Sequence, residues 1–171
     1  VWKYIMANIF YNRAIRKIVT SFGDLFSNIY LARYDSSGDE ESRMLIPIAY
    51  AQKEKYVQRL EGDPDLEKKV QITLPRFSYE MNGFSYDSSR KQNTNIRNVA
   101  QTSSGSVSQY VGVPYNFDFN LYLYVRNIED GHQALEHILS YFTPDYTIKI
   151  NMIPEMGIVK EVPVVFNSTS Q

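Results

Sequence analysis

The run FDFNLYLYVRNIEDGHQALEHILSYFTPDYTIKI, residues 117–150, constrains the fold of this chain more than any other segment. Its first part alternates between two sets of side chains, which is typical of a strand that buries one face. The inward set is Phe117, Phe119, Leu121, Leu123 and Val125, and the outward set is Asp118, Asn120, Tyr122 and Tyr124. We therefore expect the outward face to present tyrosines to water or to a partner.

A helix and another strand follow in the same run. Asp130 and Gln133 have the spacing of a capping box, so we expect Asp130 to cap the helix. The helix ends at Thr143-Pro144, and its buried stripe is Leu135, Ile138, Leu139 and Phe142. Residues 146–153 then alternate as a strand. This order predicts an α+β fold with a mixed, mainly antiparallel sheet and helices packed on one face.

Residues 11–22 predict an amphipathic helix, because the apolar side chains from Ile15 to Phe22 recur at helical spacing. Gly23 follows, and we expect the helix to end there, since glycine tolerates the left-handed conformation of a helix end. A further short helix is predicted over residues 52–62.

Strands are predicted over residues 27–35 and 43–51, with a polar loop at 36–42 that turns at Gly38. Proline cannot donate a ladder hydrogen bond, so Pro47 places the second strand at an edge or a bulge. For the same reason Pro163 predicts that the final strand, within residues 157–166, lies at an edge.

Residues 70–86 allow two interpretations. Asn82-Gly83 is a strong hairpin signal, yet the flanking runs also fit one long strand with a bulge at Gly83. Residues 87–108 are rich in Ser, Asn, Gln and Thr and show no regular pattern. Loops of that length are either functional or mobile, so we expect a flexible arm that orders on a partner or a surface loop without a role.

Composition indicates a single domain over residues 1–171. Apolar residues make up 43% of the chain, enough for a core, and the formal net charge of −1 argues against binding nucleic acid or an anionic membrane. The chain has no cysteine, which excludes disulfides, thiolate catalysis and cysteine-based metal sites. Its N-terminal run has polar residues throughout and lacks the apolar block of a signal peptide or a membrane span.

No motif for chemistry stands out. His132 and His137 are five residues apart on the predicted helix, so they point in different directions and cannot share a metal. The glycines are dispersed rather than grouped in a phosphate loop, and the adjacent Asp39, Glu40 and Glu41 lie in a solvated loop. We therefore expect no catalytic residue, no cofactor and no metal.

The 14 tyrosines are unusual and have two explanations, strand propensity and a protein contact surface. Alternation and position make some residues candidates for a subunit or partner interface. They are Asp24, Leu25, Phe26, Arg76, Tyr79, Tyr122 and Tyr124, with Phe26 also a core candidate.

Five blocks, in order, carry a resemblance to a known family. They are GDLFSNIYLAR (residues 23–33), IPIAYAQKEKY (46–56), LPRFSYEMNGFSYD (74–87), SVSQY (106–110) and ILSYFTPDY (138–146). Together they resemble the tail sheath stabiliser, or tail-completion protein, of T-even-like contractile-tailed bacteriophages. The resemblance runs from about residue 11 to residue 150, and the order of the blocks makes it more specific than any single motif.

The resemblance implies a phage tail-terminator-like fold and a homo-hexameric ring at the head-proximal end of the tail. Such a ring caps and stabilises the extended sheath and tube, joins the tail to the neck, and needs no enzymatic activity. Its implied partners are the tail sheath protein, the tail tube terminator and neck or head-completion proteins. The implied location is the virion tail or neck, after assembly in the host cytoplasm. Because family members continue past the equivalent of Gln171, we expect a chain truncated at its C-terminus whose sheet lacks an edge.

Two other functions stay open at this level. Another neck ring, such as a tube terminator or head–tail adaptor, would share the fold, although an adaptor near DNA favours a basic lumen stripe that the sequence lacks. A small-molecule-binding domain would need a pocket with convergent polar groups, and the sequence indicates none.

Overall fold

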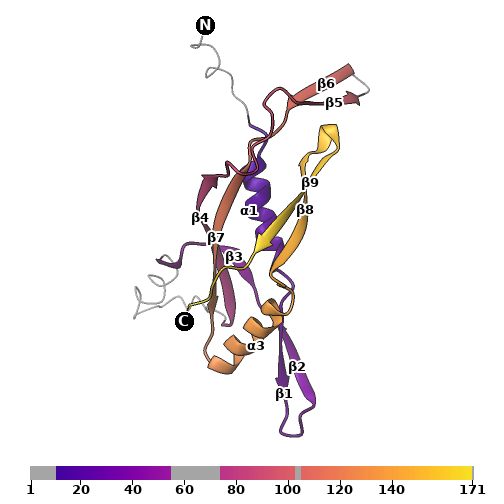
Figure 1. Ribbon diagram of the computed structural model, residues 1–171. Coiled ribbons are helices and arrows are strands. Elements are labelled where there is room, and N and C mark those ends of the chain that lie inside the picture. Colours follow the sequence, from indigo (N-terminus) through magenta and orange to yellow (C-terminus); the bar gives the residue numbers. More distant parts are fainter. Residues whose placement is uncertain (1–10, 55–73, 103–104, 171) are drawn as a thin grey trace, which may run out of the picture.

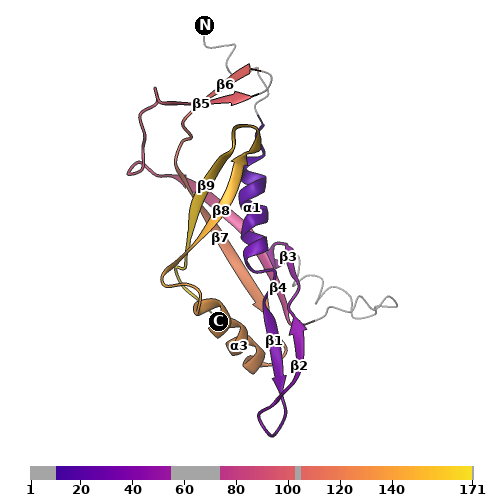
Figure 2. The same ribbon diagram turned by 90° about the vertical axis from the view of Figure 1, so that its right-hand side faces the viewer.

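A computed structural model describes residues 11–54, 74–102 and 105–170. The molecule is elongated, and hairpins project from its two opposite ends (Figure 1). Helix α1 runs along the long axis beside a sheet and a long hairpin (Figure 2). The elements are α1 (Ala14–Leu25), β1 (Tyr30–Tyr34), β2 (Glu40–Leu45), β3 (Ile48–Tyr50), β4 (Arg76–Tyr86), β5 (Arg97–Thr102), β6 (Gly105–Tyr110), β7 (Tyr115–Tyr124), α3 (Ile128–Leu139), β8 (Asp145–Ile153) and β9 (Ile158–Val165).

The strands form one sheet of three and three separate pairs within the described ranges. The larger sheet has the order β3-β4-β7, with β3 parallel to β4 and β4 antiparallel to β7. The pairs β1–β2, β5–β6 and β8–β9 are antiparallel. The α+β class and the mainly antiparallel pairing are confirmed. The prediction of one mixed sheet is wrong, because β7 and β8, which flank α3, belong to different sheets.

A small core holds the middle of the molecule together. Both helices contribute to it, on the face of β4 and β7 that carries Phe77 and Leu121. Its buried members are Phe22, Phe26, Ile29, Leu31, Ile46, Phe77, Tyr79, Ala134 and Ile138. Removing this apolar surface from water is the main source of stability for the fold.

Gly23 lies inside helix α1, so the prediction that the helix ends there is wrong. The helix continues to Leu25 because this glycine is needed for close packing. A Cβ atom at position 23 would lie 2.4 Å from the hydroxyl oxygen of Tyr79. Glycine therefore makes room for the end of the Tyr79 side chain against the helix, a use of the residue that its sequence position alone does not distinguish from a cap.

Asp130 is not the cap of α3. The N-cap is Asn127, and Asp130 lies in the first turn of the helix, where it is only 4% exposed. Its carboxylate accepts two hydrogen bonds from the guanidinium of Arg33 on β1, at 2.5 and 2.8 Å. The acidic side chain is thus used to join the helix to a distant strand. The helix also ends earlier than predicted, at Leu139, so Phe142 lies beyond it.

Pro47 separates two strands instead of interrupting one. Strand β2 ends at Leu45 and β3 begins at Ile48, and the two belong to different sheets. The carbonyl oxygen of Pro47 accepts a hydrogen bond from Phe77 N–H at 2.9 Å, which connects β3 to the start of β4. The edge positions predicted from Pro47 and Pro163 hold, since β3 is at an edge of its sheet and β9 has one partner in the described chain.

Strand β4 is one long strand with a bulge, which excludes the hairpin interpretation of Asn82-Gly83. The register passes from Met81 opposite Phe119 to Gly83 opposite Asp118, so Asn82 is the extra residue. Residues 70–73 and most of the helix predicted over 52–62 lie outside the described residues; Lys53 and Glu54 are helical.

The segment 87–108 has more regular structure than predicted. Strands β5 and β6 pair from Arg97 opposite Tyr110 to Thr102 opposite Gly105. Polar side chains obscured this pairing in the sequence, because two solvated strands need no apolar face. The hairpin projects from the end of the molecule opposite to β1–β2 (Figures 1 and 2). Its flexibility stays a prediction, as does the division of the whole chain into a single domain.

Candidate assembly surface

One face of the β4–β7 pair carries a continuous row of aromatic side chains, which we call the aromatic strip. Successive strand residues point to opposite faces, so a bulge of one residue exchanges the faces that follow it. Asn82 is the extra residue of this bulge. Because of it, Phe84 and Tyr86 point to the same face as Phe77 and Tyr79, although the two pairs occupy even and odd positions. The strip consists of Phe77, Tyr79, Phe84 and Tyr86 from β4 and Tyr115, Phe117 and Phe119 from β7.

The part of the strip before the bulge is covered by helix α1. The ring of Phe22 stacks on Phe119, with centroids 4.3 Å apart and planes inclined by 10°. The same ring lies 5.6 Å from Tyr79. Phe77 is fully buried and Tyr79 is 8% exposed. Burial raises the pKa of the Tyr79 hydroxyl above its usual value, with a smaller contribution from the nearby charge of Asp24. This half of the strip is core.

The part beyond the bulge extends past the described core, and we call it the outer patch: Phe84, Tyr86, Tyr115 and Phe117. Phe84 is 57% exposed, Tyr86 47% and Tyr115 43%. The rings contact one another, with Phe84 5.8 Å from Tyr115 and 6.0 Å from Phe117 and with Tyr86 5.9 Å from Tyr115. Exposed aromatic rings in mutual contact form the kind of apolar surface that protein interfaces use.

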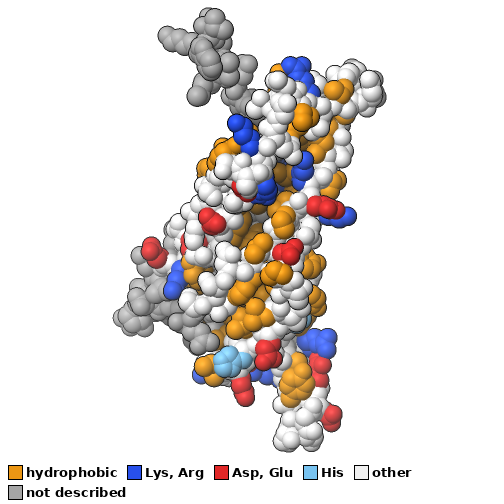
Figure 3. Space-filling view, in the orientation of Figure 1, with side chains coloured by type: hydrophobic (Ala, Val, Ile, Leu, Met, Phe, Trp, Pro, Cys, Tyr) orange, Lys and Arg blue, Asp and Glu red, His pale blue; other side chains and the backbone are white. Residues whose placement is uncertain are grey.

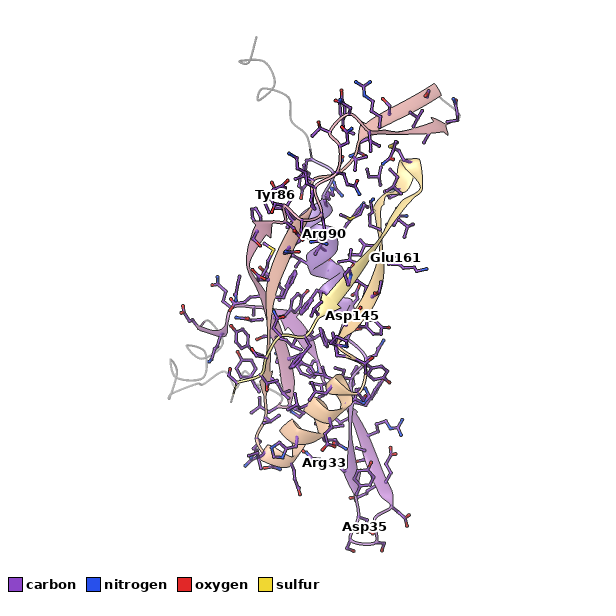
Figure 4. All side chains as sticks on the ribbon, viewed as in Figure 1. Arg33, Asp35, Tyr86, Arg90, Asp145 and Glu161 are labelled. Carbon is purple, nitrogen blue, oxygen red and sulfur yellow. The ribbon has the colours of Figure 1, made fainter. Side chains whose placement is uncertain are left out.

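Charged and polar side chains lie at the same end of β4 and β7 as the outer patch, on the opposite face of the two strands. The guanidinium of Arg90 donates hydrogen bonds to Asp87 at 2.6 Å and to the side chain of Asn116 on β7. The hydroxyl of Ser89 donates to the other oxygen of Asp87 at 2.5 Å. These donors, Ser89 first and Arg90 second, lower the pKa of Asp87 to about 2. Tyr86 and Arg90 lie in the same upper part of the molecule (Figure 4).

The opposite face of β4 and β7 is polar and hydrogen-bonded. Tyr122 donates its hydroxyl proton to Glu80 at 2.6 Å and accepts a hydrogen bond from Asn120 at 2.9 Å. The bond to the negative carboxylate raises the pKa of Tyr122, because the phenolate form would repel Glu80. Lys53 lies over the Tyr122 ring, 5.8 Å from its centroid. Tyr122 is therefore held in a fixed position.

The structure distributes the predicted interface residues over three environments. Asp24 is exposed and Leu25 half-buried at the end of α1, whereas Phe26 and Tyr79 are in the core. Arg76, Tyr122 and Tyr124 are half-buried on the polar face, where Arg76 is directly opposite Tyr124. The predicted exposure of Tyr79 is wrong, because Tyr79 is three positions after Arg76 and the two therefore point to opposite faces. Contact of any of these residues with a partner stays a prediction.

Sequence reasoning missed the outer patch, although a signal for it is present. The apolar residues of β4 occupy odd positions up to Met81 and even positions from Phe84 onward. A change of this kind around Asn82-Gly83 indicates a bulge that keeps one face apolar throughout. If the apolar face is traced along both strands with this bulge, the sequence predicts that the row of aromatic residues continues past Met81.

Exposed apolar side chains extend well beyond this patch. Among the described residues, 22 large hydrophobic side chains are at least 36% exposed, whereas 10 hydrophobic side chains are buried. Hydrophobic side chains occur along the whole length of one face (Figure 3). In the hairpin β1–β2, every residue of β2 is exposed. A subunit that leaves this much apolar surface uncovered has the properties of an assembly component.

Two further kinds of site were sought in the described part of the chain. No group of three or more His, Cys, Asp or Glu side chains there could hold a metal ion. Its helices are too short and too polar to cross a membrane.

Comparisons with known proteins point to contractile phage tails. Residues 9–171 match the family model described as T4-like virus Myoviridae tail sheath stabiliser. The chain is also similar to the tail completion protein gp15 of Enterobacteria phage T4, with 36% identity over 147 residues. The aligned region covers 82% of this chain and 53% of that protein, so the chain spans about half the length of the curated relative.

Proposed function

Because the chain belongs to the T4-like virus Myoviridae tail sheath stabiliser family, we propose that it is a structural subunit of a homo-hexameric ring at the head-proximal end of a contractile tail. The ring caps the last disc of the sheath and the end of the tube, and it presents another surface to the neck. The partners in this proposal are the tail sheath protein, the tail tube terminator and neck or head-completion proteins. Assembly takes place in the host cytoplasm, and no cofactor or nucleic-acid contact is involved.

The observation that carries the proposal is the outer patch. The same strip of aromatic residues is core on one side of the Asn82 bulge and exposed on the other. A monomer gains nothing in stability from exposed rings in contact with water, whereas an interface buries them. Asp24, Leu25, Arg76, Tyr122 and Tyr124 supply additional contact residues in this proposal, since each retains exposed surface.

The shape of the subunit supports a ring. A closed ring of identical subunits needs two different, complementary surfaces on each subunit. An elongated body with a hairpin at each end offers distinct surfaces at its ends and along its side (Figure 1). Stabilising an extended sheath then requires only that the ring binds the extended arrangement more tightly than the contracted one.

Electron microscopy of the purified chain tests the ring directly. We expect class averages with six-fold symmetry and, in the presence of sheath protein, rings at the ends of extended sheath. Two variants form a matched pair. Phe84→Ser removes an aromatic side chain of the outer patch, and Phe84→Tyr is the control that keeps an aromatic side chain there. A species that stays monomeric at high concentration and ignores sheath and tube proteins would contradict the proposal.

A further inference from the structure

A basic groove lies between the N-terminal half of α1 and strand β8. It has a volume of about 390 Å³. Four cationic side chains line it, together with Thr20, Ser21, Ile150 and Asn151; the cations are Arg13, Arg16, Lys17 and Lys149.

Two of these cations are already bound and two are available. Lys17 donates a hydrogen bond to the carbonyl oxygen of Met152 at 2.6 Å, and Lys149 forms an exposed ion pair with Glu161 at 3.2 Å. Within the described residues, Arg13 and Arg16 form no ion pair. The groove therefore presents two guanidinium groups to an incoming anion, and guanidinium groups bind carboxylates in a bidentate manner.

The complementary charge is on the tip of the β1–β2 hairpin, the acidic tip: Asp35, Asp39, Glu40 and Glu41. Asp35 accepts hydrogen bonds from Ser36, and Glu40 forms an ion pair with Arg43 at 2.8 Å. Asp39 and Glu41 form no ion pair with any described residue. Gly38, with φ +85°, makes the tight turn between β1 and β2, so these acidic residues all lie at or next to the end of a narrow two-stranded arm.

The tip and the groove cannot meet within one molecule. Asp35 lies at the lower end of the molecule, whereas Glu161, which marks the position of Lys149, lies in the upper half (Figure 4). A contact between them must therefore join two copies, with the tip of one and the groove of the next. Such a contact uses different surfaces on the two copies, which is the kind that generates a closed ring.

We propose that the acidic tip of one copy docks into the basic groove of its neighbour and sets the register of the ring. This inference rests on the proposed function, since it names the contact between its subunits. Exposed ion pairs contribute little affinity individually, but charge complementarity steers association and excludes wrong registers. In this arrangement the outer patch supplies affinity and the tip and groove supply specificity.

Charge reversal on the full chain tests the contact. We expect Arg16→Glu and Glu41→Arg each to raise the concentration needed for ring assembly about tenfold, because each places like charges opposite one another. Both side chains are exposed, so the fold tolerates either change. Circular dichroism checks that it does. The matched control, Glu136→Arg, reverses an exposed charge on α3, outside the tip and the groove, and should leave assembly unchanged.

Mixing the two defective variants gives the decisive result. The Glu41→Arg variant has a less acidic tip that carries one cation and an unchanged basic groove, and the Arg16→Glu variant has an unchanged acidic tip and a less basic groove that carries one carboxylate. Each tip then matches the groove of the other variant, so the mixture should assemble into rings in which the two variants alternate. A tag on one variant measures the alternation by native mass spectrometry, as three tagged and three untagged subunits per ring.

The outcomes separate this inference from the proposed function. If both single variants formed rings at the same protein concentration as the wild-type chain, the tip-and-groove contact would be refuted, whereas the proposed ring would not. Loss of assembly in Arg16→Glu alone would show that another acidic partner, or a nucleic-acid phosphate, occupies the groove, and would also overturn it. Absence of rings in the wild-type chain would refute the proposed function and this contact with it.

Discussion

The two halves of the aromatic strip have the same chemistry and opposite environments. Before the Asn82 bulge, Phe77 and Tyr79 lie in the core, where Phe22 of α1 contacts the Tyr79 ring and Phe77 has no exposed surface. Beyond it, Phe84 and Tyr86 point the same way, and they are 57% and 47% exposed. The difference is in the neighbours and not in the residues. Aromatic composition alone therefore does not distinguish buried from exposed side chains, whereas the packing of the core against one half of the strip does.

The largest expected difference between the halves is in subunit stability. Phe77→Ala leaves a cavity in the core and should lower the free energy of unfolding by about 3–5 kcal/mol. Phe84→Ala removes a ring from an exposed surface and should change it by less than about 0.5 kcal/mol. Urea unfolding of the monomeric chain measures both values. Equal losses at the two positions would show that the outer patch is also core.

Assembly should show the reverse order. Phe84→Ser combined with Tyr115→Ser removes two central rings of the outer patch, and interface aromatics cost about 1 kcal/mol or more each when truncated. We expect an assembly concentration about 30-fold higher, measured by analytical ultracentrifugation, with unchanged urea unfolding of the subunit. Phe84→Tyr with Tyr115→Phe is the control that keeps both rings. Normal assembly of the serine variant would move the interface elsewhere.

The close approach of α1 predicts a smaller effect on the covered half. Gly23→Ala places a Cβ near the Tyr79 hydroxyl, and the cost of overpacking, about 1–3 kcal/mol, exceeds the helix-propensity gain of about 1 kcal/mol. We expect a net loss of about 1 kcal/mol, partly restored by Tyr79→Phe. Gly131→Ala in α3 is the control, because its Cβ would lie 3.4 Å from Val125. Stabilisation by Gly23→Ala would refute the close packing.

The smallest expected effect is the pH dependence at the end of β4 and β7 that carries the outer patch. The pKa of Asp87 is lowered from 3.8 to about 2, so its charged form is favoured in the folded chain. Its contribution to stability is therefore present above about pH 4 and is lost as pH falls through about 2. Asp87→Asn should make the acid limb of the stability curve shallower between these values. A curve unchanged by the substitution would exclude ordered donors at Asp87.

The sequence predicted elements more successfully than their pairing. Period-two and helical patterns located α1, β1, β7, α3 and β8, because each buries one face. Pairing between distant segments has no local signal, which is why β7 and β8 were placed in one sheet. The β5–β6 hairpin was missed for a related reason, since solvated strands carry no apolar alternation.

Predictions for individual residues were wrong where one residue type has several structural roles. Gly23 and Asp130 have the identities expected of helix caps, and both serve long-range contacts instead, with Tyr79 and with Arg33. The exposure predicted for Tyr79 fails for another reason, since Tyr79 is an odd number of positions from Arg76 and alternation places the two on opposite faces of β4. The family, in contrast, followed from five ordered blocks, and the match over residues 9–171 confirms it.

The single added residue at position 82 also determines which mutations strand β4 tolerates. Substitutions of the exposed rings beyond it should change the stability of the fold little, whereas substitutions of the buried rings before it should lower that stability. A one-residue insertion or deletion there, however, would turn the distal rings to the other side of the sheet in one step. At the bulge, a change in the number of residues therefore matters more than a change in residue type.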